Sequence, residues 1–167
     1  MFLFNKKKNI DAIAKKGNSV FDKGDYLKAI EIWKEGLDSI KQPHNGKGEA
    51  VWFQTSIADA YFMLKEYEKA YDFLMDAKSN ISGVGVANPF VMLRFGQCCY
   101  ELNKKEEAQE YLFRAYLLAG KEIFELCIVS ALGMACVFVD TKLLHETLRA
   151  IRFEDCENVY DTCYGVL

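Results

Sequence analysis

The side chains with the most reactive chemistry in this sequence are six cysteines and two histidines. The cysteines lie in apolar, helix-like segments without a CxxC pair, which favours reduced and buried thiols over a disulfide framework. Zinc needs closely spaced ligands, whereas His44 falls in a predicted loop and His145 lies near the end of the chain. We therefore expect no metal site among the cysteines, which are Cys98, Cys99, Cys127, Cys136, Cys156 and Cys163.

Catalytic motifs are also scarce. The stretch Ser82-Gly83-Val84-Gly85 is glycine-rich, but it lacks the lysine of a phosphate-binding loop. No serine stands in a nucleophile-elbow motif, and no cationic residue is evident near the cysteines to lower a thiol pKa. Carboxylates at Glu106, Glu107 and Glu110 stand beside lysines on a predicted outer helical face, where solvation is their expected role. We expect neither an enzyme nor a bound cofactor.

The charge balance limits the class of partner. The 167 residues carry a formal net charge of −3 with a pI near 5.5, which gives no positive field for phosphates, so no nucleic-acid partner is expected. The basic run Lys6-Lys7-Lys8 follows the apolar start of the chain, which is the reverse of a secretory signal peptide and predicts a cytoplasmic location. Residues 126–139 carry no charge but are shorter than the roughly 20 residues that cross a bilayer, so no membrane insertion is expected.

The elements that must position any binding residues are read from a pattern that occurs three times. The stretch from Gly24 to Ile30 returns in looser form from Lys65 to Tyr71 and from Asn103 to Gln109. Each copy follows an apolar helical segment with a small residue, then bulky apolar or aromatic ones; the small residues are Gly17, Ala58 and Gly96. This order resembles the tetratricopeptide repeat (TPR) family, whose helix-turn-helix units recur about every 34 residues. The resemblance implies an all-α, right-handed solenoid of three helical hairpins.

The expected boundaries are an N-terminal tail at 1–9, hairpins at 10–43, 49–80 and 89–119, and a C-terminal unit at 121–167. The landmark alanines Ala29, Ala70 and Ala108 are 41 and 38 residues apart, so the surplus over the family period falls in turn-rich connections at 43–48 and 82–89. These connections should emerge on one rim, where they are an alternative recognition surface. The apolar segment 126–139 predicts either a cap over the end of the solenoid or a homodimer interface.

Spacing of three and four residues in the first helix of each hairpin predicts one shared, concave surface. This surface combines a polar row with aromatic rows, which suits the anchoring of a peptide or helix. Core packing between the hairpins would explain Phe21, Phe62 and Tyr100 as well as partner binding does. The predicted partner-binding residues are Asn18, Phe21, Trp52, Thr55, Asp59, Phe62, Phe90, Leu93, Arg94, Gln97 and Tyr100.

The resemblance implies a protein or peptide partner on this surface. Chaperone-binding members of the family hold a C-terminal carboxylate with lysine, asparagine and arginine; Asn18 and Arg94 stand in suitable places, but Ala14 replaces the first lysine. Small bacterial proteins with three such hairpins resemble immunity proteins that neutralise a toxin, or chaperones for secreted proteins. The rim insertions and early first repeat favour the immunity role, with a secretion chaperone or a generic adaptor as alternatives.

Overall fold

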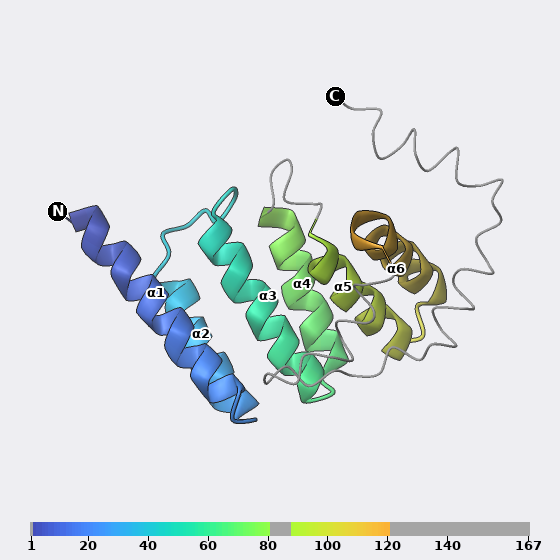
Figure 1. Cartoon of the computed structure of the whole chain (residues 1–167), viewed down its shortest axis with the longest axis horizontal. Coiled ribbons are helices and arrows are strands. Elements are labelled where there is room, and N and C mark those ends of the chain that lie inside the picture. Colours follow the sequence, from blue (N-terminus) through green and yellow to red (C-terminus); the bar gives the residue numbers. More distant parts are fainter. Residues whose placement is uncertain (1, 81–87, 121–167) are drawn as a thin grey trace.

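The structure of the chain is a computed structural model that describes residues 2–80 and 88–120, with side chains from residue 9 onward. These residues form six helices and no strand. Figure 1 shows the helices following one another along the molecule in sequence order. They are α1 (Phe2–Phe21), α2 (Tyr26–Asp38), α3 (Gly48–Met63), α4 (Tyr67–Asn80), α5 (Pro89–Glu101) and α6 (Lys105–Ala119).

The six helices pack as three hairpins. Within each hairpin the two helices lie against each other, α1 on α2, α3 on α4 and α5 on α6. Neighbouring hairpins join through α2 with α3 and α4 with α5, and the first helices also touch along the row, α1 with α3 and α3 with α5. This arrangement is the helical solenoid that the repeat pattern predicts.

The same turn closes all three hairpins. One residue in each turn adopts a left-handed backbone, namely Gly24 (φ 81°), Lys65 (φ 61°) and Asn103 (φ 58°). The next amide in the chain donates back to the carbonyl five residues earlier, at distances of 3.3, 2.9 and 2.8 Å. This is the hydrogen-bond pattern of a Schellman cap, which satisfies carbonyls at a helix end. The third turn is therefore built like the first two, although Lys105 replaces the aromatic residue of the family pattern.

Helix starts follow ordinary capping chemistry where the sequence predicts it. Asn88 caps α5, because its side-chain oxygen accepts hydrogen bonds from the amides of Phe90 and Val91, and Pro89 occupies the first turn. Asp25 caps α2 in the same way through the amide of Lys28. Helix α1 begins at Phe2, so residues 2–9 are helical and do not form the expected N-terminal tail. Neither glycine nor proline interrupts that stretch, so nothing in it ends the helix.

The core is a continuous seam between the helices. Trp33 is 3% exposed and belongs to this seam, as do the fully buried Ala29, Ala58 and Ala70. Phe53, Phe95 and Leu112 are also fully buried. The predicted capping or dimerisation segment 126–139, and the whole unit 121–167, lie outside the described residues.

Candidate functional site

Three large side chains among the predicted partner-binding residues are exposed to solvent. Trp52 on α3 is 40% exposed, Phe90 at the start of α5 is 58% exposed, and Tyr100 near its end is 42% exposed. Asn18 on α1 is exposed as well, while Thr55 on α3 is half-buried and donates its hydroxyl to the carbonyl of Val51. A row of aromatic residues therefore remains open to solvent along α3 and α5.

Four other predicted contact residues are part of the core. Phe21 (5% exposed) packs its ring on Tyr26 and Trp33, and Phe62 (2%) packs on Tyr67. Leu93 and Gln97 on α5 are also buried. Helical spacing gives direction but not depth, and at these four positions neighbouring residues of the fold cover the side chain. These four side chains lie beneath the surface that the exposed residues form.

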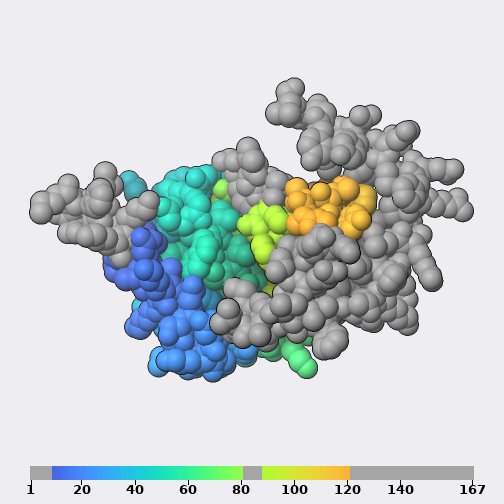
Figure 2. All heavy atoms as spheres, in the orientation of Figure 1, coloured from blue at the N-terminus to red at the C-terminus, as the bar shows by residue number. Residues whose placement is uncertain are grey.

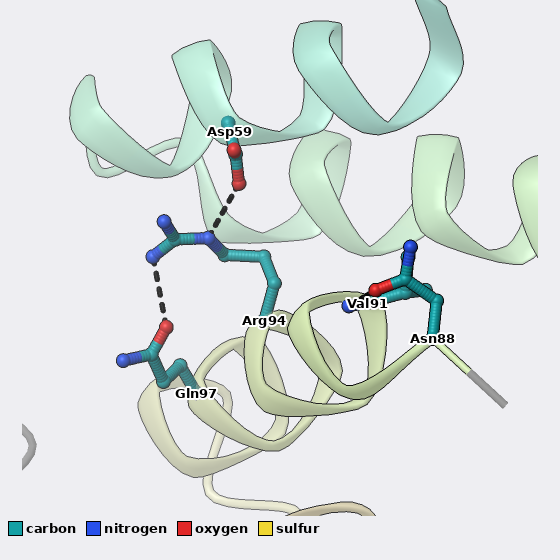
Figure 3. Close-up of polar contacts among 5 residues, drawn as sticks. All are labelled: Asp59, Asn88, Val91, Arg94 and Gln97. Carbon is teal, nitrogen blue, oxygen red and sulfur yellow. Dashed lines mark hydrogen bonds and ion pairs between the residues drawn. The ribbon is translucent and has the colours of Figure 1, made fainter. Parts of the chain in front are cut away.

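The predicted polar row is partly an internal network that joins α3 to α5 (Figure 3). The Nε of Arg94 lies 2.6 Å from Oδ1 of Asp59, and its Nη1 donates to Oε1 of Gln97 at 2.8 Å. The guanidinium also lies over the ring of Phe62, 4.4 Å from its centroid. Both charged side chains are largely buried, at 17% and 23% exposed. Asp59, which spacing placed among the partner-binding residues, is thus paired with a residue of this chain and is not an open acidic site.

Trp52 is held in a defined orientation. Its ring meets Trp33 edge to face at 6.1 Å between centroids and Phe53 at 5.2 Å. Trp33 is in turn fixed against α1, where its indole N–H lies 3.5 Å from the carbonyl of Ala14. A buried aromatic cluster therefore supports the exposed part of Trp52, which limits the entropy that a partner would have to remove on binding.

A hollow lies between α1 and α3 beside Trp52. Its volume is about 470 Å³, and its wall combines apolar groups with two exposed carboxylates. Figure 2 shows residues of α1, in blue, directly beside those of α3, in teal, on one face of the molecule. The lining includes Ile10, Asp11, Ala14, Glu49, Trp52 and Phe53. Sequence reasoning included Trp52 among the partner-binding residues but missed Glu49, although Glu49 stands one helical turn before Trp52.

The first rim connection is anchored to the scaffold. His44 is buried, with Nε2 3.2 Å from the carbonyl of Ile40 and Nδ1 3.4 Å from the side-chain amide nitrogen of Gln42. The amide of Gly46 donates to the carbonyl of Asn80 at the end of α4. The second connection falls mostly at 81–87, outside the described residues. The predicted rim surface is therefore described only at its first loop.

The two cysteines in the described part of the chain are buried thiols. Burial raises the pKa of the Cys98 thiol to about 12 and that of the Cys99 thiol to about 11, so both stay protonated at neutral pH. Both thiols are free and buried, as expected. In this part of the chain no three metal-ligating side chains come together, and no helix is long and apolar enough to cross a membrane.

Comparison with known proteins identifies the fold. No family model matches the chain, and no curated protein is detectably similar in sequence. A solved structure described as the first TPR of Spaghetti (RPAP3) bound to the HSP90 peptide SRMEEVD is similar, with a TM-score of 0.61 and 24% sequence identity. The alignment covers 86% of this chain and 93% of that one. The chain thus has the architecture of tetratricopeptide hairpins.

Proposed function

We propose that this chain is a non-enzymatic interaction module that binds a protein or peptide segment along α1, α3 and α5. The observation that carries the proposal is the row of solvent-open aromatic residues Trp52, Phe90 and Tyr100 on a rigid helical scaffold. Aromatic side chains dominate the energetic centres of protein interfaces, and these lie on successive first helices of the solenoid. The similar solenoid that holds an HSP90 peptide supports the same use of the fold.

The way in which a segment is held should differ from a carboxylate clamp. Ala14 offers no charge where the first clamp lysine would stand, and Arg94 is occupied by Asp59 and Gln97. Recognition through aromatic anchors fits these residues better. Among specific roles we favour an inhibitor or immunity protein that neutralises a toxin, with a secretion chaperone or a generic adaptor as the alternatives.

Partner capture followed by anchor truncation tests the proposal. The native protein is used as bait, the captured protein is identified and purified, and its affinity is measured by calorimetry. Truncating a central aromatic anchor costs at least about 2 kcal/mol, so Trp52→Ala and Phe90→Ala should each weaken binding about thirtyfold. Circular dichroism should show unchanged helix content in both variants.

Leu27→Ala is the control. Leu27 is an exposed apolar residue (61% exposed) on α2, which is the second helix of its hairpin and lies outside the proposed binding helices. This substitution should leave the affinity unchanged. Normal binding by both anchor variants, combined with loss of binding after substitutions at His44 to Lys47, would move recognition to the rim. Capture of a toxin would support the immunity role, capture of a secreted translocator the chaperone role, and capture of a regulatory protein the adaptor role.

A further inference from the structure

The hollow between α1 and α3 has an acidic lining. Asp11 comes from α1 and Glu49 from the first turn of α3, and both carboxylates are exposed. In the part of the chain that the structure describes, neither takes part in an ion pair, and no basic residue lines the hollow. Lys47, the lysine nearest to Glu49 in the sequence, instead donates its ammonium to the carbonyl of Lys41 in the preceding loop.

We infer that this hollow receives a basic side chain, arginine or lysine, from the segment bound in the groove, an inference that rests on the proposed function. The cation would lie over the exposed face of Trp52 and between the two carboxylates. Among aromatic side chains, the indole ring of tryptophan attracts a cation most strongly. The indole is already fixed by Trp33 and Phe53, so the cation meets a ring that needs no reordering.

The size of the hollow suits such a guest. A volume of about 470 Å³ falls inside the range of about 300–1,000 Å³ that is usual for small-molecule pockets. Ile10 and Ala14 provide apolar walls for the methylene stem of the side chain, while the charged end keeps contact with water. Both the methylene stem and the charged end of an arginine or lysine side chain therefore have suitable surroundings in the hollow.

The same lining disfavours acidic and purely apolar guests. A glutamate or C-terminal carboxylate would be repelled by Asp11 and Glu49, and an apolar side chain would leave both carboxylates partly desolvated without a partner. Helix stability alone explains Glu49, because a carboxylate in the first turn of α3 is favourable. Asp11 stands one helical turn before Lys15 in α1, and it lines the hollow together with Glu49.

Fluorine NMR with three matched peptides tests the inference on the full chain. The chain has two tryptophans, so labelling with 5-fluorotryptophan gives two signals, which Trp52→Phe assigns. The probes are capped peptides of sequence Gly-Ser-Leu-X-Leu-Ser-Gly, in which X is arginine, its neutral isostere citrulline, or glutamate. The arginine peptide should shift the Trp52 signal and leave that of Trp33. The citrulline and glutamate peptides should bind at least about tenfold more weakly.

Removing the two carboxylates should abolish this preference. The double substitution Asp11→Asn with Glu49→Gln should weaken arginine-peptide binding about tenfold and bring it to the level of the citrulline peptide. The control is Glu35→Gln with Asp38→Asn, which makes the same change of charge at exposed positions of α2 and should have no effect. Binding of the arginine peptide should also weaken as salt concentration rises.

The outcomes separate this inference from the proposed function. Equal binding of the arginine and citrulline peptides, a preference for glutamate, or no shift with any peptide would overturn the inference. The proposed function would still stand if Phe90→Ala weakens the native partner while the Asp11 and Glu49 double variant does not. If the arginine preference is found but the anchor truncations leave the native partner unaffected, the hollow binds cations and the groove-binding function fails.

Discussion

Three glycines in helices of this solenoid each leave room for one particular side chain. A Cβ built on Gly17 would lie 2.1 Å from the indole nitrogen of Trp33, and one on Gly36 would lie 2.4 Å from the ring of Phe53. At Gly96 the nearest atom is 2.5 Å away, in the side chain of Leu112. The small residues of the repeat therefore accept large side chains of a facing helix, instead of only bringing two backbones together. This is why small and aromatic positions alternate in the sequence.

The alanine that marks the second hairpin should not tolerate a larger residue. Ala70 is fully buried in α4, so Ala70→Leu forces extra methylene groups into a packed seam, at a cost of about 1–3 kcal/mol. Denaturant unfolding followed by circular dichroism measures the change in the free energy of unfolding. The control is Ala12→Leu, an exposed site in α1, which should be nearly neutral. Equal stability of the two variants would contradict the close packing of the seam around Ala70.

At the scale of the elements, α3 and α5 are joined directly by a charged contact. Asp59 and Arg94 are less than a quarter exposed, so loss of either charge leaves the other poorly solvated. Asp59→Asn and Arg94→Met should each lower the free energy of unfolding by about 1–3 kcal/mol. The double variant should lose less than the sum, with a coupling energy of about 0.5–3 kcal/mol in a double-mutant cycle. Strict additivity would mean that solvent screens the pair completely.

The sequence predicted the helices well and the depth of their side chains poorly. Small residues, turns and apolar stripes predicted the three helical hairpins that the structure shows. Spacing also placed Trp52 and Phe90 on an open helical face, and both are exposed. It could not tell Phe62, which is buried, from Tyr100, which is exposed, because both occupy the same position of the repeat. The difference arises from packing between hairpins, as does the Asp59 and Arg94 pair, and neither is encoded within one helix.

Within the described residues, the three hairpins form a linear array in which each hairpin packs against its neighbours. The middle hairpin, α3 with α4, packs against α2 on one side and α5 on the other. Helix α1 stands at the end of the row, where it packs on α2 and touches α3. In such arrays stability is approximately a sum of unit and neighbour terms, so local opening should begin where neighbours are missing.

Native-state hydrogen exchange should therefore be uneven along the chain. Amides of α3 and α4 should exchange at least about tenfold more slowly than those of α1, a difference of about 1.4 kcal/mol in opening free energy. In Ala70→Leu the protection of α3 and α4 should fall toward that of α1, because the substitution weakens the hairpin that both neighbours share. Exchange measured by mass spectrometry on peptides from each helix provides the test. Equal protection of α1 and α3 in the wild type would show that the array opens only as one cooperative unit, in which the interfaces between hairpins outweigh the stability of any single hairpin.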